Sequence, residues 1–259
     1  MRRMTGLWLL AAAALVSPAA AQSDKTWESF RADVFGSRPI ADGTNVITLQ
    51  APVRAEDAAI TPIDVAPAPG AKPIKALTLI IDENPAPVVA SFSFGPGAMN
   101  AAISTRVRVD SYSYVRAVAE LEDGSLHMVK KFVKASGGCS APAGKDHDKA
   151  IAEMGKMKLR QFTPKDGARE AQIMIRHPNY SGLQMDQLTR NYTPAHFVRD
   201  IEIKRGDELI FRMEGGISLS EDPNIRFLFK PGAGDIKVTA KDTESNVWTQ
   251  SWPVEAQGS

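Results

Sequence analysis

Residues 112–124 read Y-S-Y-V-R-A-V-A-E-L-E-D-G, and they indicate the fold class more clearly than any other part of the chain. At the odd positions of residues 115–121 the side chains are valine, alanine, alanine and leucine, with Arg116 among the residues between them. An apolar residue at every second position is typical of a strand that buries one face. Asp123-Gly124 favours a tight hairpin turn. The stretch therefore predicts a β-hairpin that returns through residues 125–134.

The same alternation recurs on both sides of this hairpin. Immediately upstream, Ile103, Val107 and Val109 alternate with polar residues. Further strands are predicted at residues 46–50, 59–65, 74–82, 88–94, 170–176, 197–204, 208–214, 225–230, 235–242 and 247–254. Many short strands separated by turn signals are typical of β-sandwiches. Because 259 residues are enough for two such domains, the sequence predicts an all-β protein with two β domains.

The two domains are predicted to meet where bulky apolar residues disappear from the sequence. Residues 135–145 lack such side chains, and a brief helical pattern follows at residues 146–157. We expect a first domain at residues 22–138, a Cys-bearing linker with a short helix at residues 139–156, and a second domain at residues 157–259. A short amphipathic helix is also predicted at residues 27–35, from apolar residues at helical spacing.

The N-terminus has the pattern of a secretory signal peptide. Arg2 and Arg3 precede a short apolar run at residues 7–16, and Ala19-Ala20-Ala21 provides the small residues that signal peptidase accepts. A run this short is not expected to span a bilayer, which needs ~20 apolar residues. The sequence therefore predicts export with cleavage after Ala21, and no membrane span in the mature chain; a retained N-terminal anchor is the alternative.

Charge and residue spacing argue against two classes of function. The formal net charge is +1, and removal of residues 1–21 with their two arginines makes it −1, so no basic field is available to hold nucleic acid. Four scattered histidines and one cysteine do not give the ligand spacing of a zinc site. We therefore expect neither a nucleic-acid partner nor a metal.

Cys139 is the only cysteine of the chain, and it lies in K-A-S-G-G-C-S-A-P-A-G at residues 134–144. Such a residue is a buried inert side chain, an intermolecular disulfide partner that links two copies, or a reactive free thiol. Gly137 and Gly138 leave little side chain near the sulfur and free the backbone, which predicts an accessible thiol on a flexible arm. An incidental surface cysteine in a linker remains the alternative.

Charged residues near Cys139 in the sequence bear on its reactivity. Lys130, Lys131, Lys134 and Lys145 flank the stretch and would favour the thiolate. His147 is close enough in sequence to serve as a base for the thiol, although a solvated helix start with an acidic first turn is the favoured explanation.

Three stretches resemble a known pair of families. V-K-A-S-G-G-C at residues 133–139, at the end of the last strand of the first domain, resembles SoxY, the sulfur-carrying subunit of the bacterial thiosulfate-oxidising system. I-M-I-R-H-P-N at residues 173–179 and V-T-A-K-D-T-E-S-N-V-W-T-Q-S-W-P-V at residues 238–254 are similar to SoxZ, the partner of SoxY. The whole chain resembles a SoxY–SoxZ fusion of the type associated with quinoprotein dehydrogenases.

This resemblance implies two immunoglobulin-like β-sandwich domains and a periplasmic carrier. Cys139 would hold a sulfur-containing group, derived from thiosulfate or sulfide, on an arm made flexible by Gly137 and Gly138, and periplasmic sulfur-oxidation enzymes would act on it. No catalytic residue and no cofactor are implied. The chain departs from the SoxY pattern because Ser-Ala-Pro follows Cys139 and because residues 140–259 continue beyond the arm.

Two other functions are compatible with the residues. The first is a non-covalent accessory module that docks to a periplasmic quinoprotein dehydrogenase. The second is a thiol oxidoreductase, against which the lack of a second, resolving cysteine argues. A disulfide-linked dimer through Cys139 is possible under any of these functions.

Overall fold

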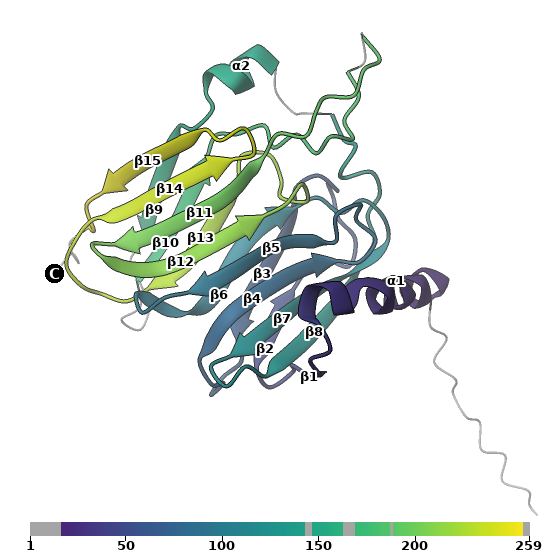
Figure 1. The fold of residues 1–259 in the computed structure, drawn as a ribbon, viewed down its shortest axis with the longest axis horizontal. Coiled ribbons are helices and arrows are strands. Elements are labelled where there is room, and N and C mark those ends of the chain that lie inside the picture. Colours follow the sequence, from purple (N-terminus) through teal and green to yellow (C-terminus); the bar gives the residue numbers. More distant parts are fainter. Residues whose placement is uncertain (1–16, 143–146, 163–168, 187–188, 256–259) are drawn as a thin grey trace, which may run out of the picture.

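The computed structural model describes residues 17–142, 147–162, 169–186 and 189–255, which form two helices and fifteen strands (Figure 1). In the first half the elements are α1 (Pro18–Phe35), β1 (Ile40–Asp42), β2 (Ile47–Gln50), β3 (Thr61–Pro67), β4 (Ile74–Ile81), β5 (Val88–Phe94), β6 (Ala98–Val107), β7 (Ser113–Leu121) and β8 (Leu126–Val133). In the second half they are α2 (His147–Ala152), β9 (Met157–Phe162), β10 (Arg169–Ile175), β11 (Val198–Arg205), β12 (Glu208–Gly215), β13 (Asn224–Phe229), β14 (Ile236–Asp242) and β15 (Val247–Trp252).

The predicted strands are present, and the all-β fold class with two immunoglobulin-like sandwiches is confirmed. The hairpin of β7 and β8 turns at Gly124, whose φ of +79° is the left-handed conformation that glycine adopts without strain. Two short strands were not predicted, β1 and β9, because neither shows a sustained period of two.

The two sandwiches are continuous with each other. The nine-stranded sheet has the order β1-β8-β7-β4-β5-β12-β11-β14-β15, and the six-stranded sheet has the order β2-β3-β6-β13-β10-β9. Antiparallel pairing of β5 with β12 and of β6 with β13 joins the halves in both sheets. The halves are therefore linked by backbone hydrogen bonds across two sheets and not by the Cys-bearing segment alone.

One aromatic group packs between the sheets where the halves meet. The ring centroids of Phe92 on β5 and Phe211 on β12 are 5.7 Å apart, and those of Phe211 and Phe227 on β13 are 5.3 Å apart. All three side chains are almost completely buried. The hydrophobic core thus crosses the junction without interruption, which favours a rigid arrangement of the two sandwiches.

Helix α1 covers the outer face of the nine-stranded sheet near β4, β7 and β8 (Figure 1). Trp27 and Phe35 pack there against Ile80, Val118 and Leu126. The helix predicted at residues 27–35 begins nine residues earlier, because a proline at the first helical position and a run of alanines favour helix. No helix of the described residues is long and apolar enough to cross a membrane.

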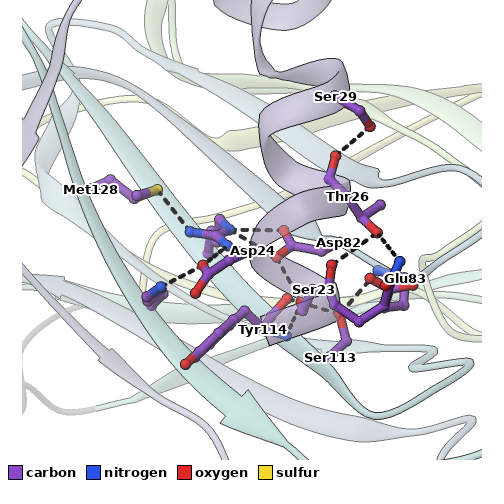
Figure 2. Close-up of polar contacts among 12 residues, drawn as sticks. Ser23, Asp24, Thr26, Ser29, Asp82, Glu83, Ser113, Tyr114 and Met128 are labelled. Atoms are coloured by element: carbon purple, nitrogen blue, oxygen red, sulfur yellow. Dashed lines mark hydrogen bonds and ion pairs between the residues drawn. The ribbon is translucent and has the colours of Figure 1, made fainter. Parts of the chain in front are cut away.

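A buried ion-pair cluster fixes α1 to the sheet (Figure 2). The Arg116 guanidinium on β7 donates to both carboxylate oxygens of Asp82, at 2.7–3.0 Å, and to Asp24 of α1 at 2.7 Å. Ser23 of α1 donates to Asp82 at 2.8 Å and accepts the backbone N–H of Tyr114. Arg116 was expected on the polar face of its strand; that face is buried, because α1 lies on it.

Candidate functional site

The segment that carries Cys139 lies along the chain that leaves β6. The backbone N–H of Gly137 donates to the carbonyl of Asp110 at 2.7 Å, and that of Gly138 donates to the carbonyl of Val109 at 3.2 Å. The N–H of Cys139 donates to the Asp110 carboxylate at 3.1 Å. Three successive residues are therefore held by the first half of the protein.

The two glycines serve close packing in this structure. Gly137 has a φ of +76°, which residues with a side chain rarely adopt, and a Cβ at Gly138 would lie 2.2 Å from the carbonyl oxygen of Ala58 and 2.6 Å from that of Val109. The structure describes a packed state of this segment, and the flexible arm stays a prediction about its movement. Glycine permits a mobile chain and also a close backbone contact, and only the neighbouring backbone distinguishes the two.

The second half of the protein covers the other side of this segment. The Ser181 hydroxyl donates to the carbonyl of Cys139 at 2.5 Å, and the Gln184 amide donates to the carbonyl of Ala141 at 2.9 Å. Both side chains come from residues 177–184, which follow β10. The segment around Cys139 is therefore clamped between the two halves, and it is not an open linker between them.

The Cys139 side chain is completely buried, so the predicted accessible thiol is an expectation that the structure corrects. Burial, helped by the nearby Asp110 carboxylate and opposed by Arg108, raises the pKa of the thiol to about 12. The lysines that were expected to favour the thiolate are not among these causes, and Lys145 lies outside the described residues. In this closed state Cys139 is a protonated, unreactive thiol at neutral pH.

Arg108 contacts both the cysteine segment and the loop that covers it. Its side chain is 1 % exposed, its Nη1 donates to the carbonyl of Gly138 at 3.2 Å, and its Nη2 donates to the carbonyl of Asn179 at 3.3 Å. Its Nε is buried and has no hydrogen-bond partner among the described residues. Nothing in the sequence pattern distinguished this arginine from its neighbours on alternate positions.

Two histidines and an aspartate that are far apart in sequence meet at the base of the covering loop. His196 Nε2 lies 2.7 Å from Asp242 Oδ2, and His177 Nε2 lies 3.6 Å from the same oxygen. All three side chains are buried, and their potential ligand atoms lie within 4.8 Å of one another. The sequence predicted no metal site, because ligand spacing along the chain does not reveal a group assembled by tertiary structure.

The hydrogen bonds of this cluster favour a structural role over metal binding. His177 Nδ1 accepts the backbone N–H of Asn179 at 3.0 Å, so the proton of the neutral ring is on Nε2, the nitrogen that would face a metal. Asp242 also accepts the backbone N–H groups of Glu244 and Asn246 and the side-chain amide of Asn246. The cluster therefore holds the start of the 177–184 loop in place.

This arrangement predicts an acid-sensitive contribution to stability. Burial, with a further effect of His196, lowers the pKa of His177 to about 4 from an ordinary 6.5. The folded state then binds fewer protons than the unfolded state, so the free energy of unfolding should fall by about 2 kcal/mol between pH 6.5 and pH 4. His177→Asn keeps an acceptor for the Asn179 N–H but does not titrate. Chemical denaturation at several pH values should show a shallower decline for this variant, and equal slopes would contradict the assignment.

Of the two remaining histidines, only His127 has a described side chain, and it lies apart from the cluster. His127 on β8 is half-exposed and its Nδ1 lies 3.3 Å from the carbonyl oxygen of Asp42. The side chain of His147, considered as a base for the thiol, lies outside the described residues.

In comparisons with known proteins, one family matches the first half of the chain and another family matches the second half. The family model for sulfur oxidation protein SoxY matches residues 31–139, and the family model for sulphur oxidation protein SoxZ matches residues 157–253. Among solved structures, the chain is similar to the sulfur carrier protein SoxY from Chlorobium limicola f thiosulfatophilum, with 30 % identity over 44 % of this chain and 96 % of that chain, and a TM-score of 0.38. No curated protein matches the chain.

The SoxY match ends at Cys139, and the SoxZ match begins where β9 begins. Both matches agree with the resemblance noted from the Gly-Gly-Cys and His-Pro stretches. The chain therefore belongs to the SoxY and SoxZ families, as a fusion of a SoxY domain with a SoxZ domain that follows it.

Proposed function

We propose that this protein is a periplasmic carrier that holds a sulfur-containing group, derived from thiosulfate or sulfide, covalently on Cys139. One observation carries the proposal: the only cysteine of the chain is the last residue of the SoxY match and lies where the SoxY and SoxZ halves meet. The protein itself supplies no catalytic group in this proposal. Partner enzymes of sulfur oxidation load the thiol and act on its cargo.

In the closed state, with Cys139 buried between the two halves, the thiol cannot be loaded. A thiol with a pKa of about 12 and no exposed surface does not react, so the segment at residues 137–142 has to leave its position between the two halves first. Leaving breaks the hydrogen bonds from Arg108, Ser181 and Gln184. The SoxZ half therefore acts as the holder that keeps the unloaded thiol protected from oxidation.

Contacts of the closed segment with the SoxZ half should control how often it opens. Ser181→Ala removes a side-chain hydrogen bond to the Cys139 carbonyl, and such a bond contributes about 1 kcal/mol. We expect the alkylation rate of Cys139 by iodoacetamide in the native protein to rise about fivefold. The exposed Ser29, which donates only within α1, provides a matched Ser→Ala control that should leave the rate unchanged. A rate unaffected by Ser181→Ala would show that this bond does not limit opening.

The proposed location is compatible with the way α1 is anchored. Cleavage after Ala21 would leave Ser23, Asp24 and Trp27, the residues that fix the helix to the sheet, in the mature chain. Residues 1–16 lie outside the described part of the chain. N-terminal sequencing of the protein from its periplasm would test the cleavage site.

The experiment that tests the carrier function is the intact mass of the mature protein isolated from its native periplasm. It is measured with and without reductant, beside Cys139→Ser. A reductant-sensitive added mass that the variant lacks is the expected result, and its size would identify the cargo. A doubled mass would show a disulfide-linked dimer, and an unmodified thiol under all growth conditions would contradict the carrier.

The second candidate is a non-covalent docking module for a periplasmic quinoprotein dehydrogenase. The complete burial of Cys139 favours it, because a docking module has no need of a reactive thiol. The Cys139→Ser variant separates the two candidates. A docking module keeps its partner and its effect on the partner's activity, whereas a carrier loses all function.

A further inference from the structure

Arg108 is a buried cation without a close anionic partner. Among the described residues its hydrogen bonds go to two neutral backbone carbonyls, of Gly138 and Asn179, and its Nε has no acceptor there. Within the described part of the chain, no carboxylate lies within ion-pair distance of its guanidinium; Glu221 and Asp57 act on it only from farther away. Burial of a charge under these conditions is costly unless an anion compensates it.

Cys139, which follows the Gly138 that accepts from Arg108, is a group that could supply that anion. Arg108 donates to the carbonyl of Gly138, the residue before the cysteine, and a negative charge on Cys139 would act on the guanidinium. In the closed state this group is a neutral thiol, so the guanidinium is uncompensated while the carrier is empty. An anionic substituent on the sulfur would change that.

Movement of the segment would free further hydrogen-bond donors of this guanidinium. When Gly138 moves away, Arg108 Nη1 loses its carbonyl acceptor, and Nε already has no partner among the described residues. Nη2 remains on the SoxZ half through Asn179. A guanidinium whose Nε and Nη1 are both without acceptors suits a sulfur oxyanion better than a neutral group, because charge-assisted hydrogen bonds to oxyanions are the strong ones.

We propose that Arg108 is the anion-recognition residue of this carrier, which pairs with a negatively charged sulfonate-type group on Cys139 and disfavours neutral or cationic substituents. The inference rests on the proposed function and names the residue of this chain that would recognise the charge of the cargo. It also assigns the arginine a role beyond joining the two halves.

The test compares charged reagents of similar size on the same thiol. Anionic 2-sulfonatoethyl methanethiosulfonate and cationic 2-(trimethylammonio)ethyl methanethiosulfonate both transfer their thioalkyl group to the cysteine thiolate, and methanesulfinate leaves. The readout is the ratio of the two modification rates in the native protein, followed by intact mass. Because both reagents depend on the same opening of the segment, a purely structural effect of a substitution cancels in the ratio.

Four proteins make the comparison: wild type, Arg108→Gln, Arg108→Lys and Arg106→Gln. We expect Arg108→Gln to lower the anionic-to-cationic ratio about tenfold, from the loss of one close charge. Arg108→Lys should keep the ratio within about threefold of wild type, because it retains the charge without the planar donors. Arg106→Gln removes the same net charge two residues away, on β6, and should leave the ratio unchanged.

A ratio that is equal in wild type and Arg108→Gln would overturn the proposal and leave Arg108 as a structural link. An equal decrease of the anionic-to-cationic rate ratio in Arg108→Gln and Arg106→Gln would also overturn the proposal, since it would show a general effect of net charge. Neither result depends on the native cargo. Failure of the carrier function appears only in the mass of the periplasmic protein, so the two failures are distinguishable.

Discussion

Gly138→Ala is expected to raise the rate at which iodoacetamide alkylates Cys139 in the native protein by about 100-fold. The added Cβ would lie 2.2 Å from the carbonyl oxygen of Ala58 and 2.6 Å from that of Val109, and both are backbone atoms that cannot rotate away. Overpacking of this kind costs up to ~3 kcal/mol, and every 1.4 kcal/mol changes an opening equilibrium about tenfold. The closed state should therefore lose its stability relative to the open state of the segment at residues 137–142, while the two sandwiches stay folded.

Two other glycines give matched controls for this result. Gly137→Ala places a Cβ whose one neighbour within 4 Å, among the described residues, is Ser140 Oγ at 3.7 Å, so it introduces the strain of a φ of +76° without a clash. That strain costs ~1–2 kcal/mol, and we expect a smaller increase, about tenfold. Gly124→Ala introduces a similar strain in the β7–β8 turn and should leave the alkylation rate unchanged. If Gly138→Ala behaved like Gly124→Ala, close packing of the segment would not be what protects the thiol.

Arg116→Met is expected to lower the free energy of unfolding by about 3–5 kcal/mol, measured by chemical denaturation. The substitution leaves the Asp82 carboxylate, which is completely buried, without its bidentate partner and with Ser23 as its remaining side-chain donor. Removal of one member of a buried ion pair is costly because the other charge stays desolvated. The loss should be accompanied by release of α1, since Asp24 and Trp27 also contact the guanidinium.

The two partners of Arg116 provide the controls. Asp24→Asn breaks a pair whose carboxylate is 41 % exposed, so we expect a loss below about 1 kcal/mol. The double variant Arg116→Met with Asp82→Leu removes both buried charges and should recover much of the stability. A loss of less than about 1 kcal/mol for Arg116→Met alone would contradict the view that this cluster fixes α1.

The sequence was enough to predict which residues form the candidate site, but not whether its thiol is exposed or buried. A single cysteine after two glycines, at the end of a strand, was enough to single out Cys139, Gly137 and Gly138. The same residues also suggested an open arm, because glycine next to small residues has no intrinsic preference between a mobile chain and a tightly packed one. Arg108 gave no comparable signal, since it is one of several polar residues in an alternating strand pattern. His177 gave none either, since a turn before a proline accounts for it.

The sequence by itself determined the fold class, most of the strands and the turn at Gly124, because the period of two and the turn chemistry are local properties of the chain. It also determined which residue offers a thiol. Only the tertiary structure decided that β5 pairs with β12 and β6 with β13, and that Cys139 is buried between the halves. The contacts that bury it join residues 30 to 71 positions apart, from Arg108 to Gly138 and from Arg108 to Asn179. Such contacts depend on which sheet edges meet in space, and local periodicity carries no information about that.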